Sequence, residues 1–166
     1  MYKKDDKIYY DWIDYEHDMK EVKNLEFDHV VGIYRGSLPM AVHISNVFKV
    51  PMSIVGFQTR DGKDKEPYMI HKSEGVPTQL LVVDDIYDTG RTMNKVIKFL
   101  ETAPLRFGMM SNYAQRRIQG FCLFGKEDPY IESDISYANE HDGSWIVFPW
   151  ETLKRHKRFK KQNEPI

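Results

Sequence analysis

The sequence predicts an α/β fold with a mostly parallel central sheet flanked by helices. The first observation is that apolar runs alternate with segments of helical spacing along the 166 residues. The second is that two passages, 30–39 and 80–93, each lead from an apolar run through a polar, glycine-containing loop into a helix. Such alternation is typical of parallel sheets, which bind ligands beyond the carboxyl ends of their strands. We therefore expect a ligand site where these two strands end.

The individual elements follow from periodicity and from turn residues. Trp12, Tyr15, Met19 and Val22 recur at helical spacing and predict an N-terminal helix over 9–24. Two more helices are expected, over 38–48, with Pro39 tolerated in the first turn, and over 93–102. Strands are expected at 27–34, 50–57, 80–83, 120–124, 131–137 and 145–148. The polar stretch 58–78 predicts a long loop or loose hairpin, whereas 103–119 supports no assignment.

Composition is typical of one soluble globular domain, with 41% hydrophobic and 30% charged residues and a net charge of -1. The single cysteine, Cys122, cannot form an internal disulfide, and it lies in an apolar run that predicts burial. No signal-like or membrane-spanning run is present, which predicts a cytoplasmic protein without membrane contact. The balanced charge argues against nucleic acid as a partner. The basic stretch 154–161 is expected to be a solvated helix end, with nucleic-acid or partner contact as the alternative.

The passage 80–93 carries the clearest chemical pattern. Asp84 and Asp85 follow the apolar run, and their carboxylates suit ribose hydroxyls or a Mg²⁺ ion. The loop that follows contains Asp88, Thr89, Gly90, Arg91 and Thr92 and opens a helix. Free backbone N–H groups and the helix dipole make such a loop a phosphate site, and Gly90 permits close approach of the backbone. A buried strand with an acidic turn and a capped helix is the structural alternative.

A second loop of the same kind follows the run that ends at Tyr34. It contains Arg35, Gly36 and Ser37, and a guanidinium offers a fork of donors to phosphate oxygens. Taken alone, this triplet is more readily a structural turn than a phosphate site.

The unbroken run from Val82 to Thr92 resembles the 5-phosphoribosyl 1-pyrophosphate (PRPP) motif of type I phosphoribosyltransferases, and Arg35–Ser37 is similar to the family's pyrophosphate loop. The resemblance covers about residues 27–151. It implies one phosphoribosyltransferase domain over 1–166, with a flexible flap loop at about 58–79 and a small C-terminal hood at about 126–151. It also implies a non-proline cis peptide beside Arg35. The flap's Arg60, Lys63, Lys65 and Lys72 either help to hold pyrophosphate or are ordinary loop charges.

The resemblance also implies roles for the loop residues. Asp84 and Asp85 would hold the ribose hydroxyls directly or through Mg²⁺, and Asp88 would be the general base near the purine N7. Asp88, Thr89, Gly90, Arg91 and Thr92 would surround the 5′-phosphate, while Arg35, Gly36 and Ser37 would face pyrophosphate.

The last third of the chain suggests how the base is selected. Phe124-Gly125-Lys126 and the segment from Trp145 to Trp150 resemble short bacterial xanthine-guanine phosphoribosyltransferases. Lys126 would donate to the purine 6-oxo group, Trp145 would stack on the base, and Ile146 would offer a backbone contact. Trp150 is expected to serve packing.

These resemblances imply transfer of the phosphoribosyl group from PRPP to guanine, xanthine or hypoxanthine in purine salvage, with Mg²⁺ as cofactor and a homo-oligomeric state of two or four chains. The alternatives are transfer to a different base, or a regulatory protein that senses PRPP or nucleotides without catalysis. The chain is too short for the two-domain architecture of PRPP synthases.

Overall fold

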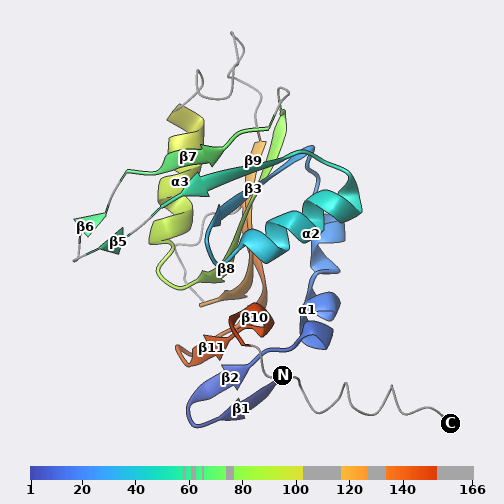
Figure 1. The fold of residues 1–166 in the computed structure, drawn as a ribbon, viewed down its shortest axis with the longest axis vertical. Helices are drawn as coiled ribbons and strands as arrows, with labels where there is room; N and C mark the ends of the chain where they lie inside the picture. Colours follow the sequence, from blue (N-terminus) through green and yellow to red (C-terminus); the bar gives the residue numbers. More distant parts are fainter. Residues whose placement is uncertain are drawn as a thin grey trace, which may run out of the picture. The chain divides into compact units, whose positions relative to one another are not determined.

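The computed structural model describes residues 1–57, 59–60, 63–64, 66–73, 77–102, 117–126 and 134–152 (Figure 1). The chain divides into two compact units. One unit is Asp18–Gly143, and the other combines Met1–His17 with the described part of Ser144–Ile166. The expectation of a single domain over 1–166 stays a prediction.

Unit Asp18–Gly143 is built on a six-stranded sheet with the order β10-β9-β8-β3-β4-β7. Four neighbouring pairs are parallel, and only β4 with β7 is antiparallel. The mostly parallel sheet predicted from the sequence is thus confirmed. The strands are β3 (His29–Tyr34), β4 (Met52–Gly56), β7 (Tyr68–His71), β8 (Gln79–Tyr87), β9 (Arg117–Gly125) and β10 (Ile135–Glu140).

Two helices cover opposite faces of this sheet. Helix α2 (Leu38–Phe48) packs on β3 at Gly32, where an added Cβ would lie only 2.7 Å from the Cβ of Ala41. Helix α3 (Arg91–Thr102) packs on the other face. Val31 and Ile33, the neighbours of Gly32, belong to one core cluster with residues of α3, and neighbouring residues of a strand point to opposite sides of the sheet. The core on that side includes Val31, Ile33, Leu80, Val82, Met93, Val96, Leu100 and Cys122. Cys122 is fully buried, as its apolar surroundings predicted.

Several predicted boundaries change. Strand β8 continues through Tyr87, so Asp84 and Asp85 lie inside the strand and not after its end. Backbone pairing with β9 extends the strand, since Asp84 is opposite Cys122 and Ile86 is opposite Phe124. In the stretch predicted as a loop or loose hairpin, β5 (Thr59–Arg60) pairs with β6 (Lys63–Asp64), and β7 joins the main sheet.

A buried polar group lies at the start of β3, at the edge opposite to the strand ends discussed below. His29 is 2% exposed, and its Nε2 lies 2.9 Å from the hydroxyl of Ser53. Burial lowers the pKa of His29 below its ordinary value, although the charge of Asp28 raises it somewhat. The ring is therefore neutral in the folded protein near pH 7.

The second unit contains a three-stranded sheet with the order β1-β2-β11. Strands β1 (Tyr2–Lys4) and β2 (Lys7–Tyr9) form an antiparallel pair, and β11 (Trp145–Val147) runs parallel to β2. The predicted helix over 9–24 is wrong at both ends. Tyr9 belongs to β2, helix α1 spans Trp12–Asp18, and a separate 3₁₀ helix, η1, spans Glu21–Asn24.

Aromatic side chains hold the second unit together. Trp150, in the short helix η4 (Pro149–Glu151), stacks on Phe148 with ring centroids 4.9 Å apart. It also contacts Trp12 and Tyr15 edge-on or tilted, at 6.0 and 5.8 Å. Its predicted packing role is therefore confirmed. No helix within the described residues is long and apolar enough to cross a membrane. The basic stretch 154–161 and residues 103–116 lie outside the described residues.

Candidate active site

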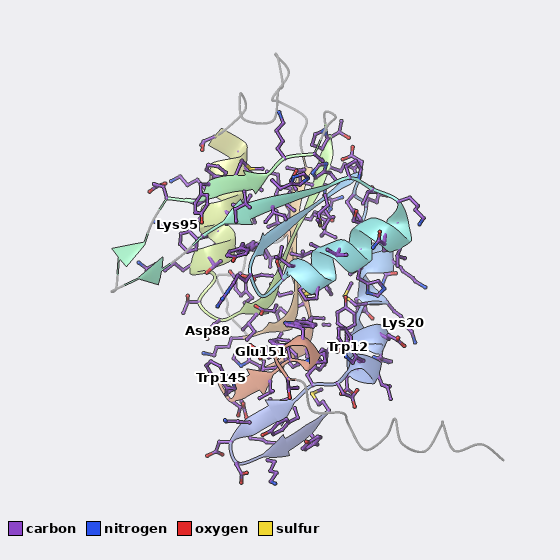
Figure 2. All side chains as sticks on the ribbon, viewed as in Figure 1. Trp12, Lys20, Asp88, Lys95, Trp145 and Glu151 are labelled. Carbon is purple, nitrogen blue, oxygen red and sulfur yellow. The ribbon has the colours of Figure 1, made fainter. Side chains whose placement is uncertain are left out.

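The carboxyl ends of β3, β8, β9 and β10 meet at one edge of the sheet, because these strands are mutually parallel. The residues that end or follow them include most of those singled out in the sequence. Figure 2 labels one of these, Asp88, at the end of β8. We build the site strand by strand, within unit Asp18–Gly143.

The loop after β3 contains a cis peptide bond and a buried serine. The Tyr34–Arg35 peptide bond is cis, as predicted from the sequence. Ser37 is fully buried, and its hydroxyl donates to the carbonyl of Ile33 over 2.6 Å. This hydroxyl is therefore used inside the loop. The side chain of Arg35 is exposed and free to meet a ligand from solvent.

Gly36 brings this loop against the acidic pair on β8. A Cβ added at Gly36 would overlap a carboxylate oxygen of Asp85 and lie 2.7 Å from its Cγ. Only glycine leaves room for the Asp85 carboxylate here. The loop after β3 and the acidic residues of β8 therefore form one continuous surface.

The two carboxylates influence each other strongly. Burial raises the pKa of Asp84 well above its ordinary value, and the negative charge of Asp85 raises it further. The Asp85 N–H donates to the Asp84 carboxylate over 3.1 Å. Asp84 and Asp85 therefore offer two adjacent carboxyl groups next to the loop that follows β8. Such a pair suits Mg²⁺, which takes its remaining oxygen ligands from water and substrate. Within the described residues no group of three His, Cys, Asp or Glu side chains could hold a metal by itself.

The loop between β8 and α3 turns at Gly90, whose φ of 69° is left-handed. A Cβ there would also lie 2.7 Å from Cζ of Tyr87, so the loop packs directly on this buried ring. Helix α3 begins at Arg91. A backbone hydrogen bond from the Asn94 N–H to the Gly90 carbonyl, over 2.9 Å, joins its first turn to the loop. Thr89 and Arg91 are exposed and Thr92 is half-buried at the helix N-terminus. The loop thus has the backbone geometry of an anion site.

Lys126 follows β9 and forms an ion pair with Asp88. Its backbone N–H donates to the Tyr87 carbonyl over 3.1 Å, which places Lys126 and Asp88 directly side by side. The side chains are 41% and 54% exposed, so a ligand can reach both. A carboxylate acceptor and an ammonium donor are therefore adjacent at the sheet edge.

The other predicted base-site residues belong to the second unit. Trp145 on β11 is 67% exposed (Figure 2), whereas Ile146 is buried and pairs with Ile8 of β2. An exposed indole is compatible with stacking on a ligand. Of the flap cations, Lys72 is exposed after β7, while Lys65 and the side chains of Arg60 and Lys63 lie outside the description.

Sequence reasoning missed His141, which follows β10 at the same edge. Its backbone N–H donates to the Gly125 carbonyl over 3.0 Å, next to Lys126. Its signal in the sequence was weak, because the strand predicted over 131–137 ends four residues before His141, whereas the observed β10 ends at Glu140. Its ring is examined below with its surroundings.

A six-stranded, mostly parallel sheet with an acidic pair and a glycine-containing loop at its carboxyl edge defines an α/β protein of the class that binds ligands beyond the ends of its strands. The sequence pattern of the phosphoribosyl transferase domain family matches residues 8–154. The chain therefore belongs to this family, as its motifs had indicated.

Solved structures show the same fold. The purine phosphoribosyltransferase from Pyrococcus horikoshii Ot3 is 24% identical, with a TM-score of 0.68, over 92% of this chain and 98% of that one. The Helicobacter pylori xanthine-guanine-hypoxanthine phosphoribosyltransferase is 19% identical, with a TM-score of 0.69, over 93% and 97% of the two chains.

A curated relative matches over a shorter segment. The orotate phosphoribosyltransferase of Sulfurisphaera tokodaii is 28% identical over 83 residues, which are 49% of this chain. The match spans only 40% of that relative's length. These similarities support the family and the fold, while the choice of base has to be argued from the site.

Proposed function

We propose that the protein is a purine phosphoribosyltransferase that transfers the 5-phosphoribosyl group from PRPP to a 6-oxopurine, in purine salvage. The acceptor would be guanine, xanthine or hypoxanthine. The products would be pyrophosphate and the nucleoside 5′-monophosphate.

The adjacent Asp88 and Lys126 side chains are the observation that carries this proposal. A free 6-oxopurine with a proton on N7 presents an acceptor oxygen and a donor N–H next to each other on one edge. A carboxylate beside an ammonium is complementary to that edge. Adenine presents a donor amino group at position 6, which would meet the ammonium donor unfavourably.

In the proposed reaction, N9 of the base attacks C1′ of PRPP. The N9–C1′ bond forms, the bond from C1′ to the pyrophosphate oxygen breaks, and the electron pair leaves with pyrophosphate. Asp88 accepts the N7 proton, which removes the positive charge from the base. Lys126 donates to the 6-oxo oxygen and aligns N9 with C1′.

The remaining residues would hold PRPP. Backbone N–H groups of the loop from Asp88 to Thr92, with the hydroxyls of Thr89 and Thr92, would bind the 5′-phosphate, and Arg35 would meet the pyrophosphate. Asp84 and Asp85 would hold Mg²⁺, which when bound would neutralise charge on the leaving pyrophosphate. For Trp145 and Ile146 the proposed contact with the base rests on the sequence resemblance.

The test is a pyrophosphate-release assay with PRPP and Mg²⁺ against guanine, xanthine, hypoxanthine, adenine, uracil and orotate. We expect turnover with at least one 6-oxopurine. Lys126→Met should lower kcat/KM for that base about tenfold or more. The matched change Lys98→Met, at an exposed position of α3, should not lower it. Turnover only with adenine or a pyrimidine would contradict the base assignment. PRPP binding without turnover on any base would favour a sensing role.

A further inference from the structure

The three strands β8, β9 and β10 are neighbours, and each is followed directly by a polar residue of different chemistry. These residues are Asp88, Lys126 and His141. Two backbone hydrogen bonds align them, from Lys126 N–H to the Tyr87 carbonyl and from His141 N–H to the Gly125 carbonyl. His141 therefore lies next to Lys126, on the side opposite Asp88.

The protonation of the His141 ring follows from its contacts. Its Nδ1 accepts a hydrogen bond from the Gly143 N–H over 3.0 Å, so in the neutral ring the proton is on Nε2. Burial lowers the pKa of His141, and the positive charge of Lys126 lowers it further, while Asp88 and Asp142 act in the opposite direction. His141 is thus a neutral donor near pH 7.

That donor has no partner in the part of the chain that the structure describes. Nε2 of His141 is buried and makes no hydrogen bond with any described residue. A buried N–H without an acceptor is destabilising, so such groups in native proteins have an explanation. Acceptance by a bound ligand would supply one.

In the proposed complex, Lys126 donates to the 6-oxo oxygen of the base. The turn at Gly143 lies against this lysine, since a Cβ added there would be 3.9 Å from Nζ. A carbonyl oxygen has two lone pairs and can accept from two donors. We propose that His141 Nε2–H donates the second hydrogen bond to the 6-oxo oxygen and makes His141 a specificity residue, an inference that rests on the proposed function.

The donors of Lys126 and His141 would differ in how strictly they exclude a 6-amino group. A lysine ammonium sits on a flexible stem and can turn toward another acceptor. The imidazole is held by its backbone bond to Gly125 and by the Gly143 N–H, so its donor has a fixed direction. A 6-amino group in that position would leave two donors facing each other, which sites of this kind reject strongly.

The test compares hypoxanthine with adenine, which differ at position 6. His141→Phe removes the donor and keeps a ring, and His141→Gln restores a terminal N–H near the original position. We expect His141→Phe to lower kcat/KM for hypoxanthine about tenfold, with the KM for PRPP within about twofold of wild type. His141→Gln should recover most of the loss. The exposed His17 of α1 provides the control change, His17→Phe, which should have no effect.

Binding of nucleotides separates this inference from the proposed function. Calorimetry with inosine and adenosine 5′-monophosphates should show that His141→Phe reduces the preference for the inosine nucleotide, with or without turnover. An unchanged preference, an equal loss for both bases, or a glutamine variant as poor as phenylalanine would overturn the role of His141. If wild type turned over no 6-oxopurine, the proposed function would fail, and the nucleotide preferences would still decide the donor's role. His141→Leu supplies the same deletion if the phenylalanine variant does not fold.

Discussion

The carboxylate of Asp88 is the group whose replacement should separate chemistry from binding. Asp88→Asn keeps the size of the side chain and removes the proton acceptor. A general base contributes about 10²–10⁴-fold to turnover, so we expect kcat to fall by about that factor. The dissociation constant of PRPP should change little. Steady-state kinetics and calorimetry measure the two quantities, with Glu140→Gln at the exposed end of β10 as the control. Loss of PRPP binding with normal turnover at saturation would contradict the assignment.

Gly36 offers a second prediction at this scale. In Gly36→Ala the new methyl group would overlap the Asp85 carboxylate, so the loop or the carboxylate must move. A displacement of about 1 Å in an active site can lower activity about a hundredfold, and we expect a loss of that order in kcat/KM for PRPP. Thermal unfolding should show a folded protein. Wild-type kinetics in this variant would show that the loop after β3 and the acidic pair of β8 do not act together.

Sequence patterns predicted the residues whose role depends on local order along the chain. Asp84, Asp85 and the loop from Asp88 to Thr92 are contiguous, and so are Arg35, Gly36 and Ser37. His141 was missed because its significance comes from the pairing of β10 with β9, which places it beside Lys126. The buried environment that keeps its ring neutral is likewise a product of the fold and not of neighbouring residues in sequence.

At the scale of elements, Trp145 on β11 and Trp150 in η4 should respond differently to replacement by alanine. Trp145 is largely exposed, so Trp145→Ala should leave the melting temperature nearly unchanged and raise the KM of the purine more than that of PRPP. Trp150 is half-buried and packs on Phe148, Trp12 and Tyr15, so Trp150→Ala should destabilise the protein by about 2 kcal/mol, less than for a fully buried tryptophan. Differential scanning calorimetry and steady-state kinetics test the pair. Equal effects of Trp145→Ala on both KM values would make this residue a packing residue.

Elements were predictable where one local signal dominates. Helix α2 spans the predicted 38–48, because Pro39 favours its first turn and apolar residues repeat on one face. The helix expected over 9–24 failed at Tyr9, since pairing of β2 with β11 outweighs helical spacing there. Strand β7 was hidden in a polar stretch, and its strand conformation depends on pairing with β4.

For the whole molecule, the buried His29 predicts how stability depends on pH. Its folded-state pKa lies below the ordinary 6.5, so the unfolded chain takes up a proton first as the pH falls. The free energy of unfolding should therefore decrease as the pH drops below about 6.5 and stop changing through His29 below its folded-state pKa. The contribution of a neutral His29 is fully present above pH 6.5.

Urea unfolding of wild type and His29→Gln at a series of pH values measures this contribution. Glutamine can still bond to Ser53 but does not titrate, so the stability of the variant should depend less steeply on pH between about 5 and 7. Taking the difference between the two profiles removes the contribution of His141, whose pKa is also lowered. Parallel profiles would show that His29 is not protonated on unfolding.

The pairing of β2 with β11 has a consequence for biosynthesis. A ribosome makes residues 7–9 before unit Asp18–Gly143 and residues 145–147 only after the whole of that unit. The three-stranded sheet of the second unit can therefore be completed only after all of unit Asp18–Gly143 has been made. Until then the β1–β2 hairpin has no β11 with which to pair. A chain released before residue 145 would therefore contain the PRPP motif but lack Trp145.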